Sequence, residues 1–292
     1  MKKVLVIGST VADIIVRLSE IPTTGGDINI KWQKMALGGC AFNVSQAIAF
    51  CNVPYLLFSP TGTGIYADYV RKELERKSIP RAEIYPDEPN GCCYCLVEDS
   101  GERTFICEHG TEYRFKKKWF ELLKTDDFEC AYICGLEIEE KTGDNIVDFL
   151  ESSKLPFYFA PGPRINKIES HKMDRIFSLA PILHVNRIEA LSYTNEDTIR
   201  KAAERIVEIT KNDVIITDGE NGSFCLEYEN KTWYEVAAFK TKVVDTIGAG
   251  DSHIGTYIAR RILGDGIRAA LLEANKIASI VVQKDGARLD YD

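Results

Sequence analysis

The sequence predicts an α/β protein built around a mainly parallel β-sheet, and three observations support this. Short apolar runs of β type alternate with amphipathic helical patterns along most of the 292 residues, as in successive βαβ units. Two segments that break this alternation carry the turn signals of β-hairpins. Hydrophobic residues make up 45% of the chain and charged residues 27%, which is the composition of a globular protein with a sizeable core.

The apolar runs, taken in order, define the expected sheet. Buried strands are expected at residues 4–8, 55–59, 131–135, 157–160, 182–186 and 214–217. Helical patterns lie between and after them, at residues 42–50, 67–77, 118–123, 144–152, 198–210, 249–262 and 267–282. We find no internal repeat and no linker long enough to divide the chain, so we expect one domain over residues 1–292.

The two irregular segments predict a small β-flap outside the main sheet. Residues 14–36 contain the alternating stretch INIKW at 28–32, next to a turn rich in proline and glycine at 22–26. Residues 91–108 resemble a hairpin around the turn Asp99-Ser100-Gly101. We expect these two segments, 14–36 and 91–108, to form a lid over a binding site.

Charge and composition narrow the functional classes. The formal net charge of −8 disfavours nucleic acid and anionic membranes as partners, because like charges repel. No stretch approaches the roughly 20 apolar residues that a membrane span requires, and residues 1–10 lack the features of a signal peptide. The nine cysteines do not show the spacing of a zinc site, which favours reduced thiols. These features predict a cytoplasmic protein.

The most informative motif is the stretch VVDTIGAGDS at residues 243–252. Its apolar start leads into a glycine-rich turn, and an amphipathic helical pattern follows. Gly248 and Gly250 allow backbone angles that are closed to other residues, and the N-terminus of the helix exposes unpaired N–H groups that suit a phosphate. A phosphate would repel Asp251, which is therefore better suited to accept a proton from an incoming hydroxyl group. The alternative is an ordinary glycine turn in which Asp251 caps the helix.

A second glycine-rich motif, GGCAFNVS, occupies residues 38–45. Gly38 and Gly39 would let a polyol approach the backbone, and Asn43 offers both a hydrogen-bond donor and an acceptor. Taken alone, this motif is equally consistent with a glycine turn that enters a helix.

Together the two motifs resemble the C-terminal and N-terminal signatures of the ribokinase-like carbohydrate kinases, the PfkB family. Residues 245–251 match the family pattern D-T-x-G-A-G-D, whereas His253 stands where the family usually has phenylalanine. The resemblance covers about residues 3–288. It implies a ribokinase-like three-layer sandwich with a lid, Asp251 as the catalytic base, and an anion hole formed by Gly248, Ala249 and Gly250.

The resemblance also implies roles for further residues and for cofactors. The substrate-binding residues would be Asp13, Gly38, Gly39, Asn43 and Glu137, and the ATP-binding residues Thr217, Gly219, Gly222 and Asn275. Asn186 and Glu189 match the family's N-x-x-E and would act on Mg²⁺ through water, whereas Asp245 and Ile247 would contribute to a site for a monovalent cation. The implied cofactors are ATP and Mg²⁺, with K⁺ allowed, and the implied assembly is a homodimer formed through the lid.

These assignments predict an ATP-dependent kinase that phosphorylates a hydroxyl group of a small sugar. A nucleoside kinase of the same family is the alternative, because the motifs do not separate the acceptors. An alternative of another class is a non-catalytic sensor of a sugar or nucleoside, against which the presence of Asp251 argues. An NAD-linked oxidoreductase is a further hypothesis, since residues 62–67 fit G-x-G-x-x-A and Glu83 follows at a suitable offset. That motif, however, does not follow the first strand.

Overall fold

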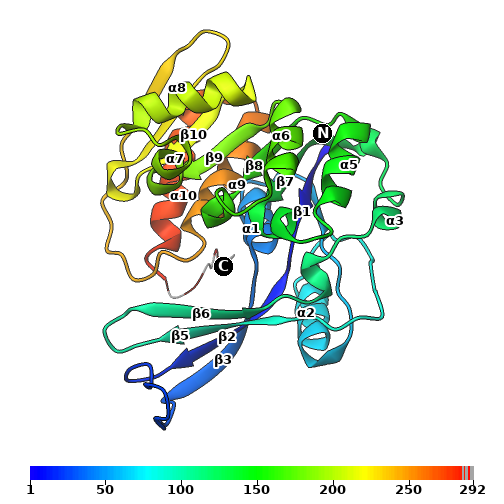
Figure 1. Cartoon of the computed structure of the whole chain (residues 1–292), viewed down its shortest axis with the longest axis vertical. Helices are drawn as coiled ribbons and strands as arrows, with labels where there is room; N and C mark the ends of the chain where they lie inside the picture. Colours follow the sequence, from blue (N-terminus) through cyan, green and yellow to red (C-terminus); the bar gives the residue numbers. More distant parts are fainter. Residues whose placement is uncertain (285, 287–288, 290–292) are drawn as a thin grey trace.

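The larger of two β-sheets forms the centre of the molecule (Figure 1). The structure is a computed structural model that describes residues 1–284, 286 and 289. The eight strands of this sheet follow the order β12-β11-β10-β9-β8-β7-β1-β4, and those from β10 to β4 are parallel. Their bounds are β1 Lys3–Ile7, β4 Tyr55–Phe58, β7 Phe128–Cys134, β8 Phe157–Ala160, β9 Ile182–Asn186, β10 Val214–Thr217, β11 Ser223–Leu226 and β12 Trp233–Val236.

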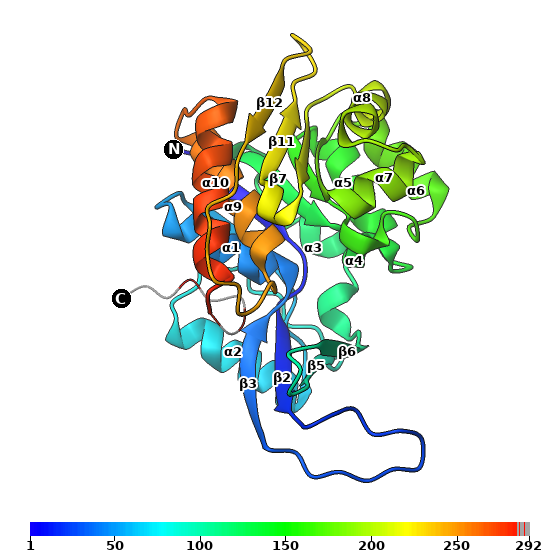
Figure 2. The ribbon, with the colours of Figure 1, turned by 90° about the vertical axis from the view of Figure 1, so that its left-hand side faces the viewer.

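Helices cover both faces of this sheet and complete a three-layer sandwich (Figure 2). One layer contains α1 (Cys40–Phe50), α9 (Ala249–Ile262) and α10 (Ile267–Val281), and α2 (Gly64–Arg76) packs on the same side. The other layer contains α5 (Asp144–Ser153), α6 (Ser170–Ser178), α7 (Arg187–Thr194) and α8 (Ile199–Thr210). The short helices are α3 (Lys117–Phe120) and α4 (Gly135–Glu139).

Alternation along the strands explains why both faces are covered. In β1, Val4 and Val6 belong to the apolar core on the side of α1 and α9, whereas Leu5 and Ile7 belong to the core on the opposite side. All four side chains are almost completely buried. A strand that is apolar on both faces can lie only between two helical layers, and the predicted α/β fold is confirmed.

The second sheet has four strands in the order β3-β2-β5-β6 and forms the lid beside the central sheet (Figure 1). These strands are β2 (Val11–Arg17), β3 (Trp32–Gly38), β5 (Cys92–Val97) and β6 (Arg103–Glu108). The pairs β2–β3 and β5–β6 are antiparallel hairpins, as their turn signals predicted. The expected strand segment at 28–32 is wrong except for Trp32, because residues 28–31 belong to the loop that connects β2 and β3. The hairpins, however, join side by side through the parallel pair β2–β5, which local turn signals cannot specify.

Some elements were not predicted. The strands β11 and β12 extend the sheet in antiparallel orientation, and their four-residue sequences SFCL and WYEV lack a clear alternation. No helix was predicted at α4, α6 or α7, which have five, nine and eight residues. Within the part of the chain described by the structure, no helix is both long enough and apolar enough to cross a membrane.

Candidate active site

Asp251 lies in the first turn of α9, next to α1. Gly248 precedes the helix with a φ of 74°, a left-handed conformation that favours glycine. The N-cap is therefore Gly248, and Asp251 does not hold the N-cap position considered as its alternative role. Instead, Oδ2 of Asp251 accepts a hydrogen bond of 2.8 Å from Nδ2 of Asn43 in α1. The two glycine-rich motifs, which are far apart in the sequence, thus meet at one carboxylate.

The surroundings of Asp251 raise the pKa of its carboxyl group toward neutral pH. Burial raises the pKa of Asp251 to about 6, and the charge of Glu137 acts in the same direction. Hydrogen bonds from Asn43 and Cys40 oppose this shift, because they stabilise the charged form. A carboxylate whose pKa lies close to neutral pH accepts a proton and releases it again at moderate cost, as a general base must.

The carboxylate of Asp13 on β2 packs directly against Gly38 of the glycine motif. A Cβ atom at Gly38 would lie 1.9 Å from Oδ2 of Asp13, so only glycine leaves room for this carboxylate. Gly39 has a φ of 97°, and a Cβ there would lie 2.4 Å from the backbone oxygen of Ser9. Burial raises the pKa of Asp13 to about 7. The structure therefore brings Asp13, Gly38 and Gly39 together: Gly38 leaves room for the carboxylate of Asp13, and Gly39 packs against the loop after β1.

Polar atoms without protein partners lie on the same loop and helix. The Oδ1 atom of Asn43 is buried without a hydrogen bond, as are the hydroxyl oxygens of Ser9 and Thr10. Buried polar groups normally have a partner, so unpaired ones adjoining a candidate site are suited to bind the hydroxyl groups of a ligand.

Glu137, at the start of α4, is 1% exposed and anchors the loop after β1. Its Oε1 accepts a hydrogen bond of 2.7 Å from the backbone N–H of Ser9, and its Oε2 accepts one of 2.6 Å from the thiol of Cys134. Burial raises the pKa of Glu137. Both oxygens thus already have protein partners, and the residue positions the loop that adjoins Gly39.

The predicted ATP-binding residues line one cavity of about 820 Å³ beside the start of α9, which we call the nucleotide-sized cavity. Thr217, Gly219 and Gly222 come from the end of β10 and the turn after it, and Asn275 comes from α10. Ala249 and Gly250 of the glycine-rich segment form part of the same wall. The cavity therefore adjoins the helix end at which a phosphate would bind.

A chain of buried polar side chains supports this cavity. Nδ2 of Asn275 donates to the backbone oxygens of Val236 and Ala237 at 3.0 and 3.2 Å, so its Oδ1 is free to accept. That oxygen lies 3.1 Å from Nε2 of His253, which must therefore donate. Nδ1 of His253 is then the acceptor for Nε2 of His184, also at 3.1 Å. Burial lowers the pKa of His253 to about 4, which keeps the ring neutral and this order of donors intact.

Asn186 and Glu189, the residues predicted to act on Mg²⁺, form the cap of α7. The side chain of Asn186 accepts a hydrogen bond from the backbone N–H of Glu189, and the carboxylate of Glu189 accepts from the backbone N–H of Asn186, both at 2.9 Å. This reciprocal pair is a capping box, which the N-x-x-E spacing also encodes. The described residues contain no group of three or more histidine, cysteine, aspartate or glutamate side chains placed to hold a metal ion.

Asp245, predicted for a monovalent cation, is buried, and both of its carboxylate oxygens have donor partners. Its Oδ1 accepts a hydrogen bond of 3.0 Å from the backbone N–H of Ile247. Its Oδ2 accepts one of 2.6 Å from the N–H of Gly286 and lies 3.0 Å from Nη2 of Arg103. The sequence did not predict this arginine as part of the site, because it lies on the lid and far from Asp245 in sequence.

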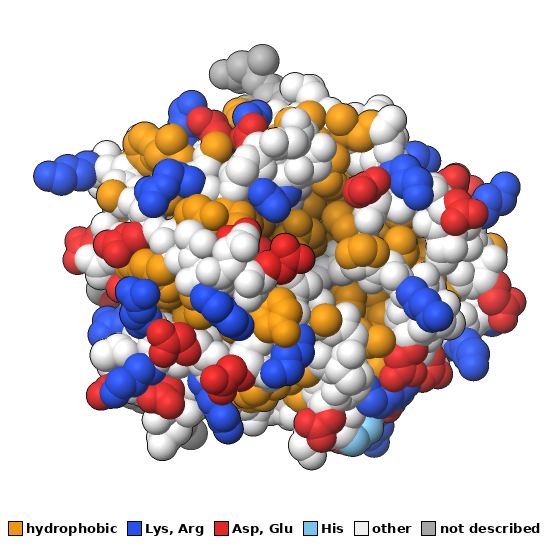
Figure 3. Space-filling view, turned by 90° about the horizontal axis from the view of Figure 1, so that it is seen from above, with side chains coloured by type: hydrophobic (Ala, Val, Ile, Leu, Met, Phe, Trp, Pro, Cys, Tyr) orange, Lys and Arg blue, Asp and Glu red, His pale blue; other side chains and the backbone are white. Residues whose placement is uncertain are grey.

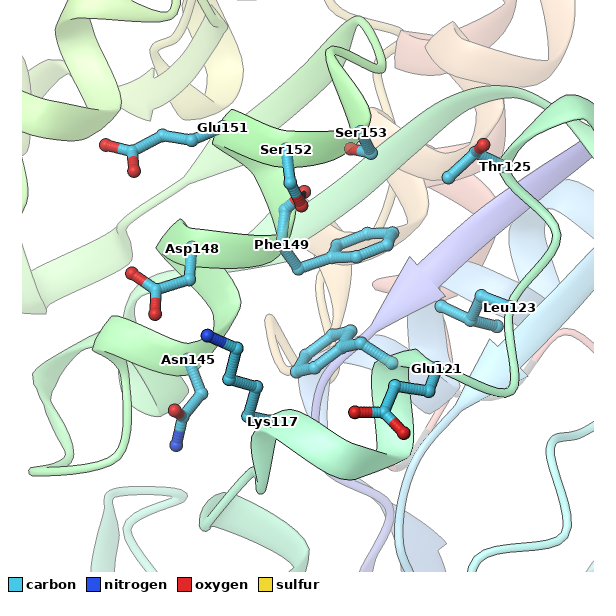
Figure 4. A pocket seen from close by; sticks show the side chains of 11 residues that line it. Lys117, Glu121, Leu123, Thr125, Asn145, Asp148, Phe149, Glu151, Ser152 and Ser153 are labelled. Atoms are coloured by element: carbon cyan, nitrogen blue, oxygen red, sulfur yellow. Dashed lines mark hydrogen bonds between the residues drawn. The ribbon is translucent and has the colours of Figure 1, made fainter.

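Two other surface hollows in the described part of the chain do not contain predicted site residues. The hollow in Figure 4, of about 630 Å³, lies between α3 and α5 and includes the stacked rings of Phe120 and Phe149, 4.7 Å apart. The end of the molecule opposite the lid carries acidic and basic side chains that are interspersed with apolar ones (Figure 3). The hollow in Figure 4 is lined by Glu121, Asp148 and Glu151 but by no glycine.

Several residues of the candidate site were missed from the sequence. Phe239 and Val243 line the nucleotide-sized cavity and are 41% and 59% exposed. Cys93 faces Asp13 in the register of the lid strands. Apolar residues in the loop after β12 were the available signal for the first two, since an exposed aromatic side chain in a loop often contacts a ligand.

Comparisons with known proteins identify the family of this chain. The profile described as "pfkB family carbohydrate kinase" matches residues 1–292. The uncharacterized sugar kinase YegV of Escherichia coli (strain K12) is 30% identical over 98% of this chain and 90% of its own. A deoxyribokinase of Salmonella typhimurium is 24% identical over 99% of this chain and 95% of its own.

Solved structures share the fold. A ribokinase from Thermotoga maritima superposes with a TM-score of 0.84 at 21% identity, covering 98% of this chain and 95% of its own. The Arabidopsis thaliana ribokinase, solved in complex with ribose and ATP, superposes with a TM-score of 0.81 at 18% identity, covering 98% of this chain and 94% of its own. The ribokinase-like three-layer sandwich predicted from the sequence is therefore confirmed.

Proposed function

This chain belongs to the pfkB family of carbohydrate kinases, and on that premise we propose that it phosphorylates a hydroxyl group of a small, uncharged sugar with Asp251 as the base. The observation that carries the proposal is the position of Asp251. Its carboxylate is bonded to Asn43 on the side of the glycine motif, and the helix that bears it begins at the wall of the nucleotide-sized cavity.

The proposed reaction is an in-line phosphoryl transfer. The acceptor hydroxyl would lie between Asp13, Asn43 and Asp251, and ATP would occupy the cavity lined by Thr217 and Asn275. As the acceptor oxygen bonds to the γ-phosphorus, the bond from this phosphorus to the leaving oxygen of ADP breaks, and Asp251 takes the hydroxyl proton. The N–H groups of Gly248, Ala249 and Gly250 would stabilise charge on the transferring group.

Mg²⁺ is proposed to enter with the phosphates of ATP. Asn186 and Glu189 offer the oxygen atoms that suit a hydrated Mg²⁺, although their capping box already engages them with each other. When bound, the ion would neutralise phosphate charge. The protein would contribute the orientation of the ion's water shell through the start of α7.

The charges of the acceptor side favour a neutral acceptor. Asp13, Glu137 and Asp251 all have raised pKa values, chiefly because they are buried. An added phosphate or carboxylate on the acceptor would face these acids, and Arg103 is already paired with Asp245. A free sugar fits this environment better than a sugar phosphate or a sugar acid.

A nucleoside is the second candidate acceptor, and Phe105 favours it. The side chains of a strand alternate between faces, so Phe105, paired with Cys95, lies on the same face of the lid as Asp13. Its ring is 51% exposed and offers a base a surface for stacking. The variant Phe105→Ala should weaken the binding of a nucleoside acceptor and raise its KM several-fold. The KM of a small sugar should remain almost unchanged.

The decisive experiment is an ADP-release screen with ATP and Mg²⁺ against free sugars, nucleosides and sugar phosphates. Asp251→Asn is the control and should lower turnover by about 10²–10⁴-fold, the usual contribution of a general base. An acceptor that is turned over equally fast by this variant would refute the role of Asp251. A full panel without turnover, together with binding of a sugar or nucleoside, would favour the non-catalytic sensor.

Assembly and location are proposals of the same kind. β6 is the edge strand of the lid and exposes Phe105 and Ile106, so its free edge suits pairing with the lid of a second copy. We propose a homodimer. Light scattering on wild type and Ile106→Lys would test it, because the variant should shift to monomer.

We also propose a cytoplasmic location without nucleic-acid or membrane partners, supported by the use of ATP, nine free thiols and the net charge of −8.

A further inference from the structure

The lid contacts the glycine-rich segment through a buried ion pair. Arg103 is the first residue of β6, and its Nη2 lies 3.0 Å from Oδ2 of Asp245, the residue that begins the D-T-x-G-A-G-D motif. The side chains are 14% and 2% exposed. Arg17, another lid arginine, pairs instead with Asp99 at 3.4 Å on the exposed surface of the lid itself.

Asp245 in turn holds the backbone of the anion hole. Its carboxylate accepts from the N–H of Ile247, directly before Gly248, whose left-handed conformation starts α9. Ile247 also packs against the buried lid residues Ile15, Cys95 and Val97. The lid therefore contacts the segment 245–247 twice, once by charge and once by apolar packing, directly before the three residues that form the anion hole.

Burial makes the positive charge of Arg103 important. A carboxylate that is 2% exposed is poorly solvated, and removal of its charged partner leaves a buried negative charge that, among the described residues, only two backbone N–H groups stabilise. Because Arg103 is on the lid, opening of the lid would remove this charge from Asp245 and would loosen the hydrogen bond that fixes Ile247. The donors around Asp245 thus fit a guanidinium group supplied by the lid better than a free monovalent cation.

We propose that Arg103 is a positioning residue, which couples closure of the lid to the geometry of the anion hole and replaces a free monovalent cation at Asp245. The inference rests on the proposed phosphoryl transfer at Asp251. It predicts that ATP is hydrolysed slowly until an acceptor is enclosed, because the anion hole acquires its final shape only when Arg103 contacts Asp245.

Steady-state kinetics of four variants tests this proposal. ADP release is measured with ATP, Mg²⁺ and D-ribose or 2-deoxy-D-ribose, whichever is turned over faster, in tetramethylammonium buffer. We expect Arg103→Gln to lower kcat by roughly 10–100-fold, within the usual range of coupling between two sites, and to change the KM of ATP little. Arg103→Lys should lower kcat less than Arg103→Gln does. Arg17→Gln is the matched control on the same lid, and Asp251→Asn reports the reaction itself.

Chemical rescue separates positioning from a general loss of structure. Guanidinium or K⁺ at millimolar concentration should raise the kcat of Arg103→Gln, because either cation can neutralise Asp245, and should leave the wild type unchanged. The proposal is overturned if Arg103→Gln matches Arg17→Gln, or if the wild type itself depends on K⁺. A loss in Asp251→Asn with an unchanged Arg103→Gln refutes this inference alone, whereas an unchanged Asp251→Asn refutes the proposed function.

The ion pair is also testable without an acceptor. Urea unfolding of Arg103→Gln, Asp245→Asn and the double variant forms a double-mutant cycle. Coupling predicts that the double variant loses less stability than the sum of the single variants, because a neutral amide at position 245 no longer needs a cation. Additive losses would contradict the contact between lid and anion hole and would overturn the proposal.

Discussion

At the scale of single residues, the candidate site contains carboxylates whose pKa values are raised by burial. Asp251 and Asp13 have pKa values of about 6 and 7, and burial is the main cause in both cases. The two residues have different proposed tasks, since Asp251 accepts the proton and Asp13 binds the acceptor. Their ionisation should therefore appear in different kinetic constants.

The pH dependence of kcat should report Asp251. The base must be unprotonated, so kcat should level off about one unit above the pKa of Asp251 in the enzyme–substrate complex and fall about tenfold per unit below that pKa. Asn43 donates to this carboxylate and lowers its pKa, so Asn43→Ala should move the acid limb to higher pH. Profiles of wild type and Asn43→Ala between pH 5 and 9 provide the measurement. An unchanged midpoint in the variant would show that another group controls the limb.

Gly38 should be irreplaceable because of Asp13. A methyl group at Gly38 would lie 1.9 Å from Oδ2 of Asp13, so Gly38→Ala must displace this carboxylate. We expect the KM of the acceptor to rise at least tenfold while the KM of ATP changes little. Gly266→Ala is the matched control, because no atom lies within 4 Å of a Cβ at that position. Equal KM values in the two variants would refute the role of Asp13.

At the scale of elements, the chain His184–His253–Asn275 joins β9, α9 and α10 behind the nucleotide-sized cavity. It ends on the backbone oxygens of Val236 and Ala237, directly before the loop that contains Phe239. A hydrogen-bonded chain of this kind fixes the distance between the two helices and that loop. His253, the departure from the family pattern, is therefore part of the support of the nucleotide cavity.

His253→Phe tests this support by introducing the residue usual in the family. The variant leaves Oδ1 of Asn275 and Nε2 of His184 without their partner, and an unpaired buried group costs roughly 1–3 kcal/mol. We expect a lower Tm and a KM for ATP that rises about three- to tenfold with the acceptor KM unchanged. His171→Phe, on the exposed surface of α6, is the control. A lower Tm with an unchanged KM for ATP would show that the hydrogen-bonded chain His184–His253–Asn275 has only a structural role.

Sequence patterns predicted the elements better than the contacts between them. All six predicted strands and seven predicted helices have counterparts, because apolar strands and amphipathic helices have local periods. The N-x-x-E spacing shows the limit of this reasoning, since the same two residues encode a capping box and a family metal motif. The parallel pairing of β2 with β5 depends on how two distant hairpins dock, and no local pattern specifies it.

At the scale of the whole molecule, the site is assembled from both helical motifs and the lid. Asp251 and Asn43 were predicted from glycine-rich motifs, and the packing of α1 against α9 brings them together. Arg103 was not placed in the site, because its partner Asp245 is distant in sequence and an isolated arginine in a hairpin has no spacing signal. What the sequence could not predict is therefore chiefly how the lid docks on the core.

Burial of acids at this junction should lower the stability of the free protein in a pH-dependent way. Asp13 has a pKa of about 7 in the folded protein and an ordinary value of 3.8, so the folded state binds its proton more tightly. The free energy of unfolding should fall as the pH rises from about 4 to 7 and remain low above 7. An asparagine does not titrate, so Asp13→Asn should stabilise the protein more at pH 8 than at pH 5.

Urea unfolding of Asp13→Asn at pH 5 and pH 8 gives the measurement, and Asp99→Asn is a control of opposite sign. A hydrogen bond and the charge of Lys31 lower the pKa of Asp99 on the exposed lid surface, so its removal should slightly destabilise the protein at both values of pH. A stabilisation by Asp13→Asn that is equal at pH 5 and pH 8 would show that the carboxyl group is not titrating in this range. A gain that is larger at pH 8 than at pH 5, together with a higher acceptor KM, would show that the protein sacrifices stability to keep an acceptor-binding carboxylate under its lid.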